Sequence, residues 1–210
     1  MGAPTGRKEL IREGRRLEYL TLGWNLVEAL VAIGSGLGAG STALVGFGVD
    51  SLIESTSGAV LLWRLLGEGG GEEREGKALR LVGYSFLLLA VWVGWDGMSS
   101  LLGHEAPDRS IVGIFLAAAS LLIMPVLARA KRRVAVGLGS KALEADSRQT
   151  DLCAYLSAIL LVGLVLNALL GWWWADPVAA LAMVPIIGGE GIRALRGEEC
   201  SDCHVDLPMD

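Results

Sequence analysis

Two acidic side chains stand four residues apart in an otherwise largely apolar stretch of the sequence. Asp50 and Glu54 belong to the segment from Thr42 to Leu66. In an α-helix a spacing of four residues is about 400° of rotation, so both carboxylates would lie on nearly the same face, one turn apart. Two like charges this close in a medium of low dielectric repel each other unless a cation sits between them. The pair therefore predicts a site for a divalent metal cation.

Polar residues also open a later apolar segment. Helical spacing places Asp146, Gln149 and Cys153 along one stripe, whereas Asp151 is five residues from Asp146 and about 140° away from it. We therefore expect Asp146 to be a metal ligand, with Gln149 and Cys153 as neighbours and Asp151 in reserve. The alternatives are an ion pair with Arg148 for Asp151 and a plain buried thiol for Cys153.

A third polar pair lies in the first apolar stretch. Asn25 and Glu28 are three residues apart, so they share a helix face and would line the same pathway. An ionised carboxylate at the centre of a membrane helix costs about 2.5 to 3.5 kcal/mol, so each needs a partner or a purpose. The alternative is that the buried acids are protonated and only hold helices together by hydrogen bonds.

The C-terminal tail contains a separate candidate metal site. Cys200 and Cys203 form a Cys-x-x-Cys pair, and His204 follows directly. These side chains could hold a soft metal such as Zn²⁺ or Cu⁺, but they supply at most three good ligands. No disulfide framework can be read from three cysteines with this spacing.

The elements that must position these side chains are membrane-spanning helices. The 210 residues are 52% hydrophobic with a mean hydropathy of +0.50, and apolar runs of about 20 residues, enough to cross roughly 30 Å of hydrocarbon, recur along the chain. The fold class is therefore all-α, a polytopic membrane protein with six transmembrane helices. The spans are predicted at Leu17–Gly38, Thr42–Leu66, Leu79–Gly103, Ile111–Ala128, Ala142–Gly171 and Ala175–Leu195.

The distribution of positive charge predicts the orientation. Of the 18 Lys and Arg residues, all but Arg109 and Arg148 fall at one side of the predicted spans, Lys131 among them in a charged connection from Arg129 to Lys141. The positive-inside rule makes that side cytoplasmic, with both termini inside. The domains are then an N-terminal cytoplasmic arm (1–16), a six-helix transmembrane domain (17–196) and a short cytoplasmic tail (197–210).

Composition and motifs weigh against other functions. A net charge of −5 argues against a nucleic-acid partner, which would need a basic patch. An intramembrane aspartyl protease could use Asp50 and Asp146 to activate water, but Glu54 would then have no role. A non-transporting structural or assembly protein is the other alternative.

The pattern resembles the cation diffusion facilitator (cation efflux) family. Its members have six membrane helices, cytoplasmic termini and a four-residue-spaced acidic or His pair on helices two and five. The matching residues here are Asp50 to Glu54, Asp146 to Asp151, and Trp174 to Pro177 before the sixth span. The resemblance implies a homodimeric antiporter in a prokaryotic cytoplasmic membrane that exports Zn²⁺ or a similar divalent cation in exchange for protons. It implies no enzymatic activity and no prosthetic group.

Two departures from the family pattern qualify this expectation. Relatives usually carry a His with an Asp four residues later on helix five, and the predicted spans of this chain contain no His. A set of oxygen ligands alone would favour harder ions such as Mn²⁺ or Fe²⁺, with Co²⁺ a further alternative to Zn²⁺. Typical members also continue into a cytosolic metal-binding domain, so the chain is expected to be a short, membrane-only branch.

Overall fold

The computed structural model describes residues 6–66, 72–104 and 107–196, and these residues form six α-helices without a β-strand. The fold class is therefore all-α, as predicted. The helices are α1 (Arg7–Ala39), α2 (Thr42–Leu66), α3 (Glu72–Gly103), α4 (Ile111–Leu138), α5 (Lys141–Leu170) and α6 (Ala175–Arg196).

A glycine followed by a serine forms two of the sharp turns between helices. Gly40 and Gly139 adopt left-handed backbone conformations (φ 65° and 62°), which glycine reaches without steric cost. The next residue begins the following helix, because the Ser41 hydroxyl accepts a hydrogen bond from Leu44 N (3.1 Å) and Ser140 accepts one from Leu143 N (3.4 Å). These turns set α1 against α2 and α4 against α5.

The predicted ends of three helices were wrong. We expected a charged connection from Arg129 to Lys141, but α4 continues through this run to Leu138. Likewise α1 begins at Arg7, inside the predicted arm, and α3 begins at Glu72. Lys and Arg are good helix formers, so a basic run ends the apolar span without ending the helix.

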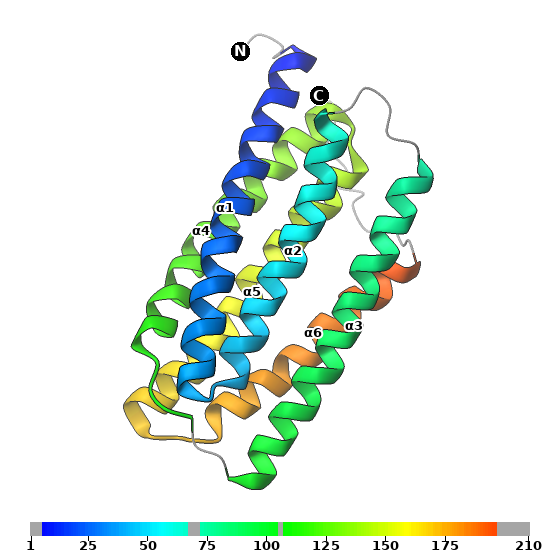
Figure 1. Cartoon of the computed structure of the whole chain (residues 1–210). Coiled ribbons are helices and arrows are strands. Elements are labelled where there is room, and N and C mark those ends of the chain that lie inside the picture. The colour runs from blue at the N-terminus through cyan, green and yellow to red at the C-terminus, as the bar shows by residue number, and fades with distance from the viewer. Residues whose placement is uncertain (1–5, 67–71, 105–106, 197–210) are drawn as a thin grey trace, which may run out of the picture.

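The helices alternate in direction, so their ends fall at two sides of the bundle. We call the side with the start of α1 and the α4–α5 turn the basic end, and the side with the α1–α2 turn the outer end. Figure 1 shows α3 and α6 as a pair set beside α1, α2, α4 and α5, and α2 contacts α1, α3, α5 and α6. The acidic residues of α2 therefore lie at the centre of the molecule.

Among the described residues, length and hydropathy make five helices candidate membrane spans, namely α1, α3, α4, α5 and α6. The α2 sequence carries Asp50, Glu54 and several hydroxyl residues, and neighbouring helices surround it. Large apolar side chains point outward instead, such as Leu30, Leu88 and Leu122, which are 68%, 71% and 74% exposed. Lipid is the solvent that makes such a surface stable, so the protein is an integral, multi-pass membrane protein.

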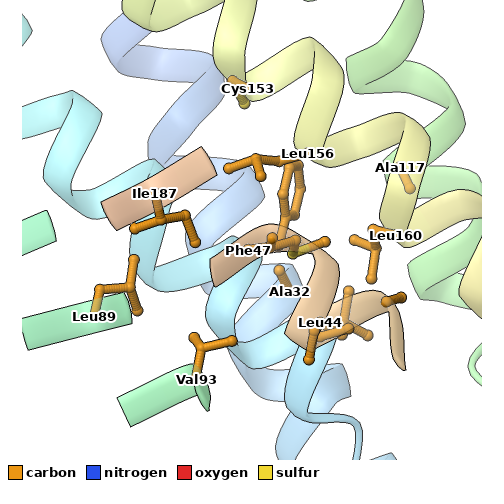
Figure 2. Packing of buried hydrophobic residues seen from close by; sticks show 14 of the residues in the cluster. Ala32, Leu44, Phe47, Leu89, Val93, Ala117, Cys153, Leu156, Leu160 and Ile187 are labelled. Carbon is orange, nitrogen blue, oxygen red and sulfur yellow. The ribbon is translucent and has the colours of Figure 1, made fainter. Parts of the chain in front are cut away.

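An apolar cluster fills the bundle on the outer side of the acidic residues. Figure 2 shows Phe47 near the middle of this cluster and Cys153 at its edge, beside Leu156. Phe47 is fully buried and precedes Asp50 by three residues on α2, about 4.5 Å along the helix axis. The apolar cluster thus separates Asp50 from the outer end.

Two glycines let α1 and α2 pack at very short distance. A Cβ added at Gly36 would lie 2.9 Å from Val45 N, and one added at Gly48 would lie 3.0 Å from Ile33 N. Small residues allow this kind of backbone approach in membrane helices. The contact brings the buried face of α1 directly against the acidic face of α2.

Candidate functional site

The buried face of α1 is polar between Glu18 and Glu28. Glu18, Thr21, Asn25 and Glu28 recur at helical spacing, and all four are buried. Glu18 to Glu28 spans ten residues, or about 15 Å of helix. Asn25 and Glu28 were predicted to share a face, and they do, in a polar row that runs from the basic end toward the middle of the bundle.

Glu28 is the meeting point of four helices. Its Oε2 accepts hydrogen bonds from Ser51 Oγ on α2 (2.8 Å) and Cys153 Sγ on α5 (3.6 Å), and its Oε1 accepts one from Ser120 Oγ on α4. Ser120 in turn accepts a hydrogen bond from Trp24 Nε1 (3.1 Å). These donors fix a carboxylate at a depth where an unpaired one would be costly.

Asp50 lies next to this group without a partner of its own. It is buried, and in the part of the chain that the structure describes it makes no hydrogen bond or ion pair. Glu54 follows Asp50 by one turn on the same face of α2. Ser51, the residue after Asp50, donates a hydrogen bond to Glu28, which also accepts one from Cys153 (3.6 Å). The arrangement therefore brings three carboxylates and one thiol, from α1, α2 and α5, around one region of the interior.

The same region is not a finished metal-binding group in this conformation. Among the described His, Cys, Asp and Glu side chains, no three come close enough together to hold one metal ion. Glu28 is tied to serine hydroxyls, and Glu54 Oε1 accepts a hydrogen bond from Thr150 Oγ1 (2.8 Å). Binding a cation here would require these side chains to turn away from their hydroxyl partners and converge.

Asp146, the carboxylate that we expected to serve as the ligand from α5, forms an ion pair with a buried lysine instead. Lys131 Nζ lies 2.5 Å from Asp146 Oδ2, 3.3 Å from Glu18 Oε2 and 3.3 Å from Thr150 Oγ1. The sequence analysis placed Lys131 in a cytoplasmic loop, which is wrong, because the side chain is fully buried inside the bundle. Its ion pairs hold α1, α4 and α5 together.

The two aspartates of α5 point to different places. Asp146 is buried against Lys131, whereas the Asp151 side chain is 31% exposed and forms an ion pair with Arg132 of α4. The expected alternative partner of Asp151, Arg148, is bonded to Glu144 (2.7 Å). The helical spacing thus correctly separated the two aspartates, but it could not identify the partner from α4.

Of the remaining sequence candidates, Cys153 belongs to the central group, Gln149 lies at its edge and the tail residues lie outside the described part of the chain. Gln149 is half-buried, and its Nε2 has no hydrogen-bond partner among the described residues. Cys153 is fully buried beside Glu28. The tail candidates Cys200, Cys203 and His204 lie outside the described residues.

Sequence reasoning missed Glu18, Ser120 and Lys131, although helical periodicity contained a signal for them. Glu18 precedes Asn25 by seven residues, which is two turns of the same face. Ser120 and Lys131 are eleven residues apart, close to three turns, and buried Met124 lies between them on that face. Glu18 and Ser120 lie inside the predicted spans and could have been found from periodicity alone, whereas Lys131 required the fourth helix to continue past Ala128.

Comparisons with known proteins identify the family and two relatives of this chain. A family model described as the cation efflux transmembrane domain matches residues 80–197, more than half of the chain. An uncharacterized transporter from Synechocystis sp. is 28% identical over 193 residues, covering 86% of this chain and 62% of the relative. The cation-efflux pump FieF from Shewanella oneidensis is 29% identical over 120 residues, covering 55% of this chain and 38% of the relative. The chain spans less than two thirds of the length of either protein.

The family match decides between the classes that the sequence left open. The matching family and the relatives are transporters, so the protein is not an enzyme and the aspartyl protease alternative is set aside. Their bacterial origin and the apolar helices fit a prokaryotic cytoplasmic membrane. The matched domain and the buried carboxylates in a lipid-spanning bundle together establish that this chain belongs to the cation diffusion facilitator, or cation efflux, family of membrane transporters.

Proposed function

We propose that the protein exports a divalent metal cation, with Zn²⁺ as the first candidate and Mn²⁺, Fe²⁺ or Co²⁺ as alternatives, in exchange for protons. Asp50, Glu54, Glu28 and Cys153 would bind the cation. The supporting observation is that three carboxylates and a thiol from α1, α2 and α5 are buried around one region of a membrane bundle. Buried ionisable groups inside a membrane protein mark ion pathways.

The chemistry of this group suits a borderline-soft divalent cation. Carboxylate oxygens and a cysteine thiolate are both ligands of Zn²⁺, and a thiolate weakens the preference for hard ions such as Mg²⁺. Asp146 stands outside this ligand set because Lys131 neutralises it. Cys153 replaces it as the ligand from α5, since its Sγ lies 3.6 Å from Glu28 Oε2.

Proton exchange follows from the same residues. Carboxylates and thiols must be deprotonated to bind a metal, so metal binding releases protons and protonation releases the metal. The apolar cluster around Phe47 closes the outer side of the site in this conformation. Alternating access would therefore require α2 to move against its neighbours so that the outer side opens and the inner side closes.

Cation flux in proteoliposomes tests this proposal. We expect Zn²⁺ flux that a proton gradient across the membrane drives and that a proton ionophore abolishes. Asp50→Asn and Glu54→Gln should each lower the flux by at least tenfold, because each removes a charged ligand without changing side-chain size. Asp108→Asn is the matched control, since Asp108 is an exposed acid at the outer end and should leave the flux unchanged.

Three results would count against the proposal. Wild-type vesicles could show no flux of Zn²⁺, Mn²⁺, Fe²⁺ or Co²⁺, the Asp50 and Glu54 variants could transport at the wild-type rate, or flux could ignore the proton gradient. Absence of flux would contradict divalent cation transport, and wild-type rates in the variants would contradict the assigned ligands. Flux that does not depend on the proton gradient would contradict the exchange for protons.

We further propose that the transporter acts as a homodimer in the bilayer, as its family resemblance implies. Many large apolar side chains are exposed on the surface of the bundle, and a second copy could pack against them. Light scattering of the purified protein in detergent should give twice the mass of the 22.1 kDa chain, and a monomer at all concentrations would contradict the proposal.

A further inference from the structure

A cation belonging to the chain itself sits in a cage of oxygens near the basic end of the bundle. The fully buried Lys131 ammonium lies 2.5 Å from Asp146 Oδ2, 3.3 Å from Glu18 Oε2 and 3.3 Å from Thr150 Oγ1. We call these oxygens the cage. All of them come from α1 and α5, and α4 supplies only the cation.

The cage also has binding capacity that the lysine does not use. Glu18 Oε1, Asp146 Oδ1 and the nearby Glu54 Oε2 are buried and have no hydrogen-bond partner among the described residues. One ammonium carries a single positive charge, whereas two ionised carboxylates carry two negative charges. A divalent cation would match both the charge and the number of free oxygens better than Lys131 does.

The cage lies on the way to the proposed transport site. Thr150 Oγ1 accepts the contact from Lys131 and donates a hydrogen bond to Glu54 Oε1 (2.8 Å). On α1, Glu18 is the first member of the buried polar row that leads to Glu28. A cation approaching from the basic end would meet Glu18 and Asp146 before Asp50.

We propose that Glu18, Asp146 and Thr150 form a second binding site for a divalent cation, in which the Lys131 ammonium holds the cation position until the cation displaces it. The long, unbranched lysine side chain can leave by swinging toward the basic end of α4. This inference rests on the proposed function, because the cage would bind the cation on its way from the cytoplasmic side to the transport site.

Mn²⁺ binding to purified protein in detergent tests the second site separately from transport. The background is Asp50→Asn, which disables the proposed transport site. The Asp50→Asn protein should itself bind one Mn²⁺ per chain at the cage. Adding Lys131→Met should tighten this binding at least tenfold, because the cation no longer has to displace the ammonium, and calorimetry or equilibrium dialysis measures both. Adding Glu18→Gln and Asp146→Asn to that variant should abolish it, because these changes remove the cage charges while keeping side-chain size.

Thermal unfolding supplies a readout that remains informative if Lys131→Met is unstable. Removing the lysine leaves two buried carboxylates without a counter-charge, so the melting temperature should fall, and Mn²⁺ should restore it in this variant far more than in wild type. Lys131→Arg, which keeps the positive charge, should show neither tighter binding nor added Mn²⁺-dependent stabilisation.

The second site is overturned if the Asp50→Asn protein binds no Mn²⁺, or if Lys131→Met changes neither the Mn²⁺ affinity nor the Mn²⁺ dependence of the melting temperature. That result would leave the proposed function intact if Asp50→Asn still abolishes flux. Conversely, absence of flux in the wild-type protein would contradict the proposed function, even if Mn²⁺ binds at the cage.

Discussion

At the scale of single residues, the interior of this transporter separates two kinds of carboxylate. Asp146 and Glu18 both form ion pairs with Lys131, whereas Asp50 has no ionic or hydrogen-bonding partner in the described part of the chain. A buried charge without a partner is costly, so it persists where a bound ion or proton compensates it. This contrast is why we assign cargo binding to the region around Asp50 and a separate role to the lysine cage.

Cys153 is expected to set the choice of metal. Replacing its soft sulfur by oxygen in Cys153→Ser should lower Zn²⁺ transport relative to Mn²⁺ by about tenfold, equivalent to about 1.4 kcal/mol. Competition between the two ions in vesicle flux measures the ratio. Ser157→Ala is the control, because Ser157 lies one turn further along α5 and, in the described part of the chain, its hydroxyl donates a hydrogen bond only to Cys153 O (2.7 Å). An unchanged Zn²⁺ to Mn²⁺ ratio in Cys153→Ser would remove the thiol from the ligand set.

At the scale of the elements, contacts at the ends and along the seams of the helices fix the position of α2. Its N-terminus is tied to α6, because Asp176 Oδ1 accepts a hydrogen bond from Ser41 Oγ (2.5 Å) and Oδ2 accepts one from Ala43 N (3.4 Å). Thr42 Oγ1 donates to Asp96 Oδ2 on α3 (2.6 Å). A helix that carries two mid-membrane acids is thus held by polar contacts at its outer end and by close glycine packing against α1.

The glycine seam between α1 and α2 should be sensitive to a single methyl group. Gly48→Ala would bring a Cβ within 3.0 Å of Ile33 N and Ala32 Cβ, so we expect it to destabilise the bundle by about 1 to 3 kcal/mol. Gly34→Ala is the matched control on the facing helix, because nothing lies within 4 Å of that Cβ position. Thermal unfolding in detergent compares the two. Equal melting temperatures for both variants would show that the seam can relax without cost.

At the scale of the whole molecule, the bundle is polar toward the basic end and apolar toward the outer end. Glu18, Glu28, Glu54, Lys131 and Asp146 occupy the first part, and the cluster around Phe47 fills the second. Oxygen atoms of buried side chains would line a cation route from the basic end to Asp50. The apolar cluster around Phe47 separates this route from the polar contacts of Ser41 and Asp176 at the outer end. The direction of transport therefore depends on which end faces the cytoplasm, and the positive-inside rule predicts that the basic end does.

Cysteine labelling tests this orientation. In a chain whose native cysteines are replaced by serine, Asp108→Cys at the outer end should react with a membrane-impermeant maleimide in intact cells. Arg132→Cys on the surface of α4 near the basic end should react only after the cells are opened, because Arg132 is 48% exposed but lies on the cytoplasmic side. The reverse pattern would invert the predicted topology and with it the direction of transport.

The amino-acid sequence alone determined that the chain is a six-helix membrane protein with acids at mid-depth, because hydropathy and helical periodicity are local properties that survive in any packing. The sequence also predicted that Asp146 and Asp151 point in different directions, since helix geometry fixes the angle between them. Only the tertiary structure decided which side chains meet. Lys131 and Asp146 are fifteen residues apart on antiparallel helices, and Glu28 meets Ser120 and Cys153 across more than ninety residues. Such encounters depend on how four helices rotate and approach one another, and no local pattern encodes that.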